Sequence, residues 1–279
     1  MLGGYTITIL EETFTLHNGV KIPKLGLGTW QSAPEDAYNA TLFALKNGYT
    51  HVDTAIVYGN ETEVGQAVRD SGLKRENVFV TTKVPAERKT YQEAKESIEQ
   101  ALRELDLEYI DLMLIHAPRP WEIMHENPEN LNYFEENREV WRALEEAYEA
   151  GSIKAIGVSN FDVKDLENIM EVCKVKPMVN QIIYHIGNTN PEVLEFCKAN
   201  DILVEGYSPI ATGRLLGNEQ IEKMASKYGK SIPQICIRYL LEKDILPLPK
   251  SVHEKYIIEN AKLDFEIEIE DMEYLDSIQ

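Results

Sequence analysis

The chain is poor in cysteine and lacks any long apolar run. Its three cysteines, Cys173, Cys197 and Cys236, are far apart and form no CxxC pair. An odd number of separated thiols predicts buried, reduced side chains rather than a disulfide framework. No stretch approaches the ~20 apolar residues that span a bilayer, and the first residues lack the basic and apolar regions of a signal peptide. We therefore expect a cytoplasmic protein without a membrane span.

Basic residues are also scarce, 28 against 47 acidic residues, which gives a formal net charge of −19. Nucleic-acid binding requires a basic face, and an anionic membrane surface would repel this chain. The composition therefore predicts a soluble protein with neither nucleic acid nor membrane as a partner. An anionic ligand would have to meet a local group of basic side chains.

A glycine-rich dinucleotide fingerprint is missing as well. Gly26-Leu-Gly28 begins the GxGxxG pattern but stops short of it, so a Rossmann site is not supported. The YxxxK spacing of short-chain dehydrogenases occurs at 91–95 and 239–243, but both lie in helix-like segments where a spacing of four is common. Without a preceding glycine-rich motif, that alternative has little support.

What the chain does have is a regular alternation of strand-like and helix-like segments. Its 279 residues, 43% of them hydrophobic, suit one domain over 1–279. The starts of consecutive predicted strands are roughly 25 to 45 residues apart, which leaves room for a crossover helix in each gap. We predict an α/β protein, a (β/α)8 TIM barrel with an N-terminal β-hairpin around Asn18-Gly19. The hairpin strands are expected at 13–16 and 20–23, and the barrel strands near 25–28, 51–54, 78–83, 110–115, 153–158, 179–183, 203–207 and 245–248.

Helix starts are indicated by capping patterns. Residues 32–35, 60–63 and 90–93 resemble capping boxes, and Asn190-Pro191 places a capping side chain before a proline. The longest stretch without clear periodicity is 118–134. We expect it to be a loop at the functional face of the barrel.

Polar residues follow the apolar runs at three of the predicted strands. Asp53, Lys83 and His116 each lie at the end of such a run, and Tyr58 lies five residues beyond Asp53. Because side chains alternate along strands, these residues can converge at the carboxyl mouth of a barrel. An ammonium beside a phenol lowers the pKa of the phenol from ~10, and a carboxylate can hold the ammonium in place. Together they suggest a proton-delivery site.

Taken singly, each of these residues has an ordinary structural explanation. An aspartate at a strand end often caps a helix, and a tyrosine in a loop usually packs. A metal-dependent hydrolase using His51, Asp53 and His116 is a further alternative, but Lys83 among those ligands would repel a cation. We therefore expect no metal, and the hypothesis depends on the conjunction of residues.

Longer motifs occur in a fixed order along nearly the whole chain. They are KLGLGTW (24–30), GYTHVDTAIVYGNETEVGQAV (48–68), VFVTTKV (78–84), YIDLMLIHAP (109–118), GSIKAIGVSNF (151–161), VNQIIYH (179–185), GYSPIATGRLL (206–216) and LPKS (248–251) with EN (259–260). With these motifs the chain resembles the aldo-keto reductases. It looks most similar to prokaryotic reductases of the 2,5-diketo-D-gluconate reductase kind.

The resemblance implies a catalytic tetrad of Asp53, Tyr58, Lys83 and His116. Tyr58 would protonate the carbonyl oxygen as hydride reaches the carbon. Lys83 would lower the pKa of Tyr58, Asp53 would pair with Lys83, and His116 would orient the carbonyl. The implied substrate-binding residues are Trp30, Tyr58, His116 and Ala117.

The resemblance also implies NADP(H) as cofactor, with NAD(H) as a second option. Side chains cannot donate hydride, so the reaction needs such a carrier. The implied cofactor-binding residues are Thr29, Ser159, Asn160, Gln181, Tyr207, Ser208, Ile210, Lys250, Ser251, Glu259 and Asn260. Among these, Lys250 and Ser251 would receive the 2′-phosphate.

Two positions depart from the pattern of the family. Tyr256 stands where an arginine usually follows the LPKS motif, so a bidentate phosphate donor is lost and NADPH is preferred by a narrower margin. Ala117 stands where many eukaryotic relatives have tryptophan, which should widen the pocket beside Trp30. A wide pocket favours varied carbonyl substrates.

These features together predict NADPH-dependent reduction of aldehydes and activated ketones. The expected partner is a small-molecule carbonyl substrate, and we expect a monomer. The alternative is a nicotinamide-binding regulatory subunit with little turnover, which the intact tetrad disfavours.

Overall fold

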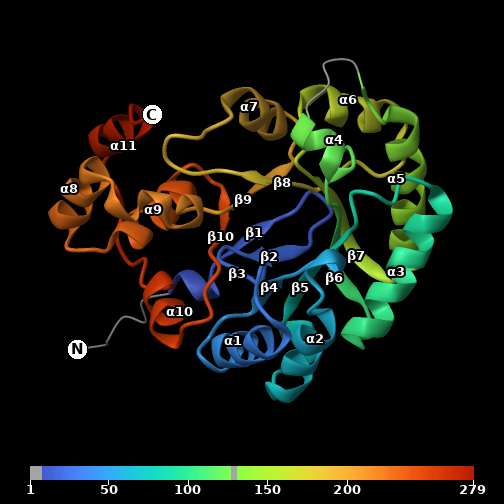
Figure 1. The fold of residues 1–279 in the computed structure, drawn as a ribbon, viewed down its shortest axis with the longest axis horizontal. Helices are drawn as coiled ribbons and strands as arrows, with labels where there is room; N and C mark the ends of the chain where they lie inside the picture. Colours follow the sequence, from blue (N-terminus) through green and yellow to red (C-terminus); the bar gives the residue numbers. More distant parts are fainter. Residues whose placement is uncertain (1–7, 127–130) are drawn as a thin grey trace.

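The computed structural model describes residues 8–126 and 131–279. Eight parallel strands form one sheet in the order β10-β9-β8-β7-β6-β5-β4-β3, and helices surround it (Figure 1). The first and last strands meet, because Gly28 and Lys250 form a parallel bridge and the Gly28 amide donates to the Pro249 carbonyl at 3.0 Å. The prediction of a (β/α)8 TIM barrel is confirmed.

The barrel strands lie close to their predicted positions. They are β3 (Leu27–Gly28), β4 (His51–Asp53), β5 (Phe79–Val84), β6 (Ile110–Ile115), β7 (Ile153–Ser159), β8 (Val179–Ile183), β9 (Leu203–Tyr207) and β10 (Leu246–Leu248). Both faces of β5 are buried, as expected of a parallel strand covered by helices outside and side chains inside. Continuous apolar runs therefore located these strands well.

The predicted hairpin precedes the barrel. Strands β1 (Thr13–Thr15) and β2 (Lys21–Pro23) pair antiparallel, with Phe14 opposite Ile22. Gly19 in the connecting turn has a φ of 88°, a left-handed conformation that glycine adopts without strain. A short 3₁₀ helix, η1 (Ile9–Glu11), comes before β1.

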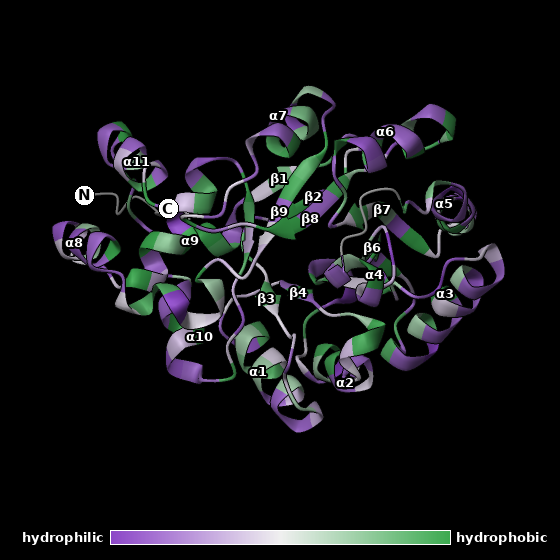
Figure 2. Ribbon diagram, turned by 45° about the horizontal axis from the view of Figure 1, so that its top comes forward, coloured by the Kyte–Doolittle hydropathy of each residue, from purple (hydrophilic) through white to green (hydrophobic). Residues whose placement is uncertain are grey.

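The helices pack their apolar sides onto the sheet, and Figure 2 shows mixed purple and green helices around mainly green strands. In α3, Ala94, Ile98, Ala101 and Leu105 are buried at the spacing of one helical face. The α-helices are α1 (Pro34–Lys46), α2 (Glu61–Asp70), α3 (Tyr91–Leu105), α4 (Trp121–Glu126), α5 (Phe134–Glu149), α6 (Val163–Val172), α7 (Pro191–Ala199), α8 (Glu219–Tyr228), α9 (Ile232–Glu242), α10 (Glu254–Asn260) and α11 (Ile269–Asp276). The other 3₁₀ helices are η2 (Ile56–Tyr58), η3 (Arg75–Asn77) and η4 (Ala211–Gly217).

Two of the four capping predictions are confirmed. Thr90 forms a capping box with Glu93, and the Asn190 side chain accepts from the Val193 amide.

The other two capping boxes are wrong. Helix α1 has Ala33 as its N-cap because Pro34 takes the first helical position, one residue later than expected. Asn60 is the N-cap of α2, but its amide donates to the carbonyls of Thr29 and Ser32 instead of capping. Its side chain thus ties the start of α2 to the loop after β3.

The segment 118–134 is not the plain loop that its sequence suggested. It contains α4, whose Pro120 carbonyl accepts from the Met124 amide, while residues 127–130 lie outside the described part. Cys197 and Cys236 are buried as predicted, whereas Cys173 ends α6 and is half-buried. Within 8–126 and 131–279, no helix has the length and apolar character needed to cross a membrane.

Close packing between α2 and α3 makes Gly65 sensitive to substitution. A Cβ at this position would lie 1.9 Å from the carbonyl oxygen of Leu105, which also accepts from Arg69 at 2.7 Å. We expect Gly65→Ala to lower the free energy of unfolding by roughly 1–3 kcal/mol, since backbone must move. Urea denaturation measures this. Gly217→Ala is the control, because its Cβ meets nothing within 4 Å; equal stability of the two variants would contradict the packing argument.

Candidate active site

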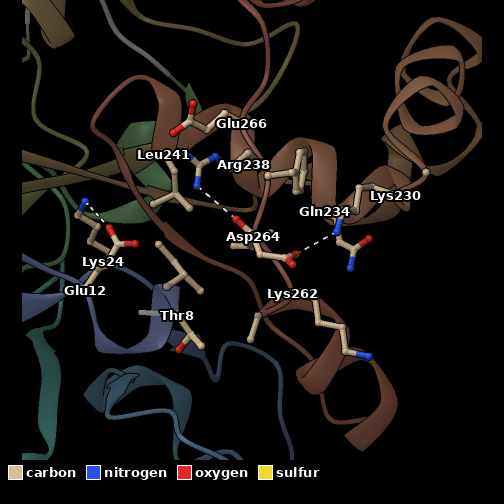
Figure 3. Close-up of a pocket in the computed structure, with 15 residues that line it drawn as sticks. Thr8, Glu12, Lys24, Lys230, Gln234, Arg238, Leu241, Lys262, Asp264 and Glu266 are labelled. Atoms are coloured by element: carbon tan, nitrogen blue, oxygen red, sulfur yellow. Dashed lines mark hydrogen bonds and ion pairs between the residues drawn. The ribbon is translucent and has the colours of Figure 1, made fainter. Parts of the chain in front are cut away.

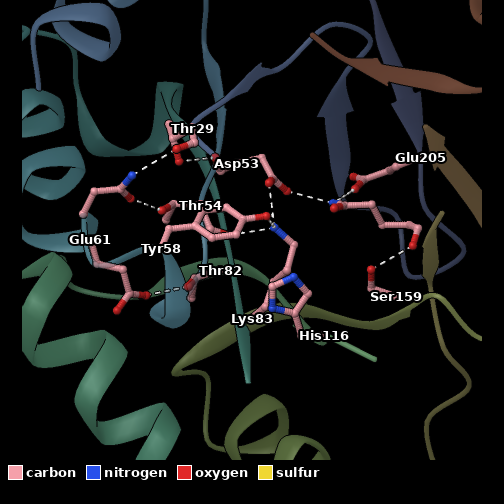
Figure 4. A network of polar contacts seen from close by, with 12 residues as sticks. Thr29, Asp53, Thr54, Tyr58, Glu61, Thr82, Lys83, His116, Ser159 and Glu205 are labelled. Carbon is pink, nitrogen blue, oxygen red and sulfur yellow. Dashed lines mark hydrogen bonds and ion pairs between the residues drawn. The ribbon is translucent and has the colours of Figure 1, made fainter. Parts of the chain in front are cut away.

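The four predicted catalytic residues lie together at the carboxyl mouth of the barrel. Asp53 ends β4, Lys83 lies in β5, His116 follows β6, and Tyr58 ends η2. Figure 4 shows Asp53 and Tyr58 converging on Lys83. The Lys83 Nζ lies 2.6 Å from Asp53 Oδ1 and 3.4 Å from the Tyr58 hydroxyl, and it also donates to the Thr54 carbonyl at 2.8 Å.

Burial dominates the electrostatics of this cluster. Burial opposes the charge of Lys83, but Asp53 and Tyr58 outweigh it and raise the pKa of Lys83 above its ordinary value. Burial raises the pKa of Tyr58, and the charge of Lys83 offsets only part of the rise. Lys83 lowers the pKa of Tyr58, as the sequence analysis predicted. The net shift of this pKa is nevertheless upward, whereas the sequence analysis expected it to be lowered. The phenol therefore stays protonated at neutral pH.

His116 is held neutral beside Tyr58. Burial first, and then the charges of Lys83 and Lys89, lower the pKa of His116 well below its ordinary value. Its ring lies 5.8 Å from the Tyr58 ring, and its Nδ1 has no hydrogen-bond partner among the residues described. A neutral imidazole can still donate one hydrogen bond and accept another.

Side chains from three separate parts of the chain hold the backbone that follows β6. The donor and acceptor pairs are Asn160 Nδ2 to His116 O (3.0 Å), Lys89 Nζ to Ala117 O (2.7 Å) and Asn137 Nδ2 to Pro118 O (2.9 Å). Three consecutive carbonyls are therefore held in place, and with them the backbone that carries the His116 ring. Ala117 itself is fully buried.

Aromatic side chains surround the tetrad. Trp121 of α4 meets the His116 ring edge-on at 5.2 Å. Trp30, a predicted substrate contact, is 45% exposed in the loop after β3. Sequence reasoning pointed to the segment 118–134 but missed Trp121, since helix α4 that presents it was not recognised.

Four of the predicted cofactor residues form one hydrogen-bonded chain next to the tetrad. The Tyr207 hydroxyl donates to Asn160 Oδ1 at 2.6 Å, and Asn160 donates to the Ser159 hydroxyl at 3.2 Å. Ser159 donates to the Gln181 carbonyl at 2.8 Å, and the Gln181 side chain donates to Asp53 at 2.8 Å. The carboxyl ends of β7, β8 and β9 are thereby connected to the catalytic cluster.

The backbone at two of these strand ends is unusual. Asn160 has a φ of 60° and Ser208 a φ of 52°, both left-handed. This conformation is uncommon for residues other than glycine and often marks functional sites. Thr29 lies on the neighbouring side, where its hydroxyl donates to the Asp53 carbonyl at 2.9 Å.

The predicted phosphate-binding residues follow β10. Lys250 is exposed, and within the described ranges it makes no ion pair. Ser251 accepts from the His253 amide at 3.1 Å. Tyr256 is 49% exposed and lies edge-on to His253 at 5.8 Å. Ile210 lies half-buried just before η4, and Glu259 and Asn260 close α10.

One buried carboxyl in the cluster escaped the sequence reasoning. Glu205 accepts from Gln181 Nε2 at 2.7 Å through Oε2, and it is fully buried. Burial first, then the charge of Asp53, raises the pKa of Glu205 to about 8. The available signal was strand alternation, which places Glu205 on the same face as Tyr207 in β9.

One cavity in the structure is lined by none of the tetrad residues, and Figure 3 shows the side chains around it. It has a volume of about 1230 Å³ and lies between η1, α9 and residues 261–266. Its charged groups are largely paired, as Lys24 with Glu12 at 2.8 Å and Lys230 with Asp264 at 3.1 Å. Since no carboxyl end of a barrel strand lines it, we do not regard it as the active site.

A barrel with a titratable cluster at the carboxyl ends of its strands is the construction of a TIM-barrel enzyme. A model of the Aldo/keto reductase family matches residues 24–279. The chain belongs to this family and is an oxidoreductase. Its assignment to the 2,5-diketo-D-gluconate reductase subgroup stays a prediction.

Similar proteins cover almost the whole chain. A glyoxal reductase of Bacillus subtilis is 40% identical over 273 residues, 97% of this chain and 94% of the relative. A glycerol 2-dehydrogenase (NADP(+)) of Saccharomyces cerevisiae is 35% identical over 96% of this chain and 90% of its own. The solved structure of a Bombyx mori aldo-keto reductase in complex with NADP is 31% identical, with a TM-score of 0.84 over 95% of this chain and 92% of that chain.

The raised pKa of Glu205 predicts a specific pH dependence of stability. The unfolded chain loses this proton near the ordinary value for Glu, whereas the folded protein keeps it until about pH 8. The contribution of the protonated Glu205 carboxyl to folding stability is therefore fully present below the ordinary pKa of Glu. It is lost as pH rises through about 8. We expect the unfolding free energy of Glu205→Gln, relative to wild type, to increase from about pH 5 to about pH 9. Urea titrations at both ends measure it, and a pH-independent difference would contradict it.

Proposed function

We propose that the protein reduces aldehydes and activated ketones to alcohols with NADPH. The observation that carries this is the tetrad geometry, in which one buried ammonium contacts both the Asp53 carboxylate and the Tyr58 hydroxyl beside neutral His116. The activities in the names of similar proteins support it, among them glyoxal reductase and glycerol 2-dehydrogenase (NADP(+)). Consumption of NADPH with methylglyoxal, sugars and keto acids, followed by absorbance, tests it.

The residues at the barrel mouth fit a nicotinamide cofactor. Gln181 Oε1 accepts no hydrogen bond within the described chain, so it is free for a donor, and Lys250 is an unpaired cation suited to a phosphate. Bound there, the cofactor supplies hydride. Ser159, Asn160 and Gln181 would hold the carboxamide and Tyr207 the ring; Thr29 would meet the ribose, Ser208 and Ile210 the pyrophosphate, Lys250 and Ser251 the 2′-phosphate, and Glu259 and Asn260 the adenine.

Tyr58 is the proton donor in the proposed mechanism. Its raised pKa keeps the hydroxyl protonated at neutral pH, so a proton is available for the carbonyl oxygen. When the proton leaves, the nearby Lys83 ammonium stabilises the phenolate that remains. Asp53 and the Thr54 carbonyl keep this ammonium in position.

His116 orients the substrate in this mechanism. As a neutral imidazole it can donate to the carbonyl oxygen without adding a charge that would compete with Lys83. Trp121, stacked edge-on against the His116 ring, and the fixed carbonyls after β6 limit its movement. Trp30, Tyr58 and His116 are proposed to contact the substrate. Ala117, which the sequence also suggested, is fully buried and presents no surface to a substrate in this structure, so we do not propose it as a contact.

Tyr58→Phe removes the hydroxyl while keeping the ring. Since general acid catalysis typically contributes ~10²–10⁴ in rate, we expect kcat to fall by about that factor. The Kd for NADPH should stay unchanged, because the cofactor residues are untouched. Steady-state kinetics with methylglyoxal and a fluorescence titration measure the two quantities. Near-native turnover by the variant would overturn the proposed role of Tyr58.

Tyr256 sets the margin by which NADPH is preferred. A guanidinium can contact a phosphate through two hydrogen bonds, whereas the Lys250 ammonium acts as a point charge. We expect Tyr256→Arg to tighten NADPH binding roughly tenfold without changing the Kd for NADH. Lys250→Met should weaken NADPH binding by a similar factor. Tighter binding of NADH than NADPH by the wild type would refute the proposed 2′-phosphate site.

A further inference from the structure

Glu205 and Gln181 are direct neighbours inside the barrel. Their Cα atoms are register partners in β8 and β9. Gln181 also reaches across the barrel to Asp53 of β4, so its side chain bridges two carboxyl groups. The Nε2 atom donates to Asp53 Oδ2 at 2.8 Å and to Glu205 Oε2 at 2.7 Å. A primary amide has two N–H donors, and both are therefore used.

This double engagement defines the orientation of the Gln181 amide. The terminal torsion of a glutamine is broad, so the orientation of the amide depends on its hydrogen-bond partners. A flipped amide would place its oxygen against Asp53 Oδ2, a carboxylate oxygen that needs a donor, and would turn both Nε2 hydrogens away from Glu205 Oε2. With Nε2 held by both, Oε1 remains a free acceptor.

Asp53 alone cannot fix the amide in this way. It engages one of the two hydrogens of Gln181, and its other oxygen is occupied by Lys83. Glu205 accepts the second hydrogen while fully buried, and its Oε1 has no partner in the part of the chain that is described. Its raised pKa means that it does this as a neutral acid at pH 7, without a second negative charge next to Asp53.

We propose that Glu205 is a positioning residue that fixes the Gln181 amide with its oxygen free, so that this site selects a ligand group with N–H donors. This inference rests on the proposed function, in which that ligand group is the carboxamide of nicotinamide. Glu205 acts only through Gln181 and touches neither cofactor nor substrate. The tetrad does not require it.

Hydrogen exchange of the Gln181 side-chain amide in the cofactor-free protein tests the positioning directly. Two variants of similar size test whether an acceptor is needed at this position, since Glu205→Gln keeps a side-chain oxygen acceptor and Glu205→Leu has none. We expect NMR to show both Gln181 hydrogens protected in the wild type and in Glu205→Gln. In Glu205→Leu one of them should exchange about tenfold faster or more. Unchanged protection in the Leu variant, or equal loss in both variants, would overturn the proposal.

Ligand binding tests the consequence for the site. We expect Glu205→Leu to weaken NADP⁺ binding about five- to tenfold, while 2′,5′-ADP, which lacks nicotinamide, binds as to wild type. Glu205→Gln should restore NADP⁺ binding. Combining Glu205→Leu with Gln181→Leu should add nothing to Gln181→Leu alone. An equal loss for both ligands would indicate general disruption and overturn the positioning role.

The two measurements also separate this inference from the proposed function. If the wild type binds no NADP⁺, the proposed function fails, but the exchange experiment still decides whether Glu205 fixes the amide. If NADP⁺ binds and the Leu variant loses neither protection nor affinity, only the inference fails.

Discussion

The ion pair between Lys83 and Asp53 is the constraint on which the rest of the site depends. Both side chains lie inside the barrel, where an unpaired charge is costly and removing one partner of a buried pair typically costs about 3–5 kcal/mol. The other hydrogens of the ammonium and the second oxygen of the carboxylate therefore also have partners. Thr54 takes a second hydrogen of the ammonium, and Gln181 serves the second carboxylate oxygen. The pair forms between the neighbouring strands β4 and β5, and Gln181 reaches it from β8 on another side of the barrel, so the site depends on the closed barrel.

The same burial decides the protonation of the neighbouring groups. One cation and one anion occupy the centre, and the desolvated groups around them stay neutral: the Tyr58 phenol, the His116 imidazole and the Glu205 carboxyl. A neutral shell avoids additional uncompensated charge and leaves hydrogens available for donation. Proton transfer from Tyr58 would create the one new charge in this shell, and it would do so next to the Lys83 ammonium, where a negative charge is best stabilised.

The sequence predicted the features that depend on local pattern. Apolar runs gave the barrel strands, their alternation placed Asp53 and Lys83 on inward faces, and the Thr90 capping box depends on residues three positions apart. The sequence analysis failed for features that depend on contacts between residues far apart in the chain. Asn60 does not cap α2 because its amide meets carbonyls of the loop after β3, and the pKa of Tyr58 rises because burial, which no pattern reveals, outweighs Lys83. Glu205 was missed because its partners lie on β8 and, through Gln181, on β4.

A net charge of −19 and a phosphate-bearing cofactor are compatible because the two act over different distances. At physiological ionic strength, charges farther apart than about 8 Å are largely screened in water. The acidic surface therefore contributes little at the proposed 2′-phosphate site, where Lys250 is exposed and makes no ion pair within the described chain. Since Tyr256 brings no charge there, the proposed affinity for the 2′-phosphate depends on one solvated ammonium, whose attraction is screened by salt. The nicotinamide end, by contrast, is proposed to be held by the uncharged amides of Asn160 and Gln181, which salt does not screen.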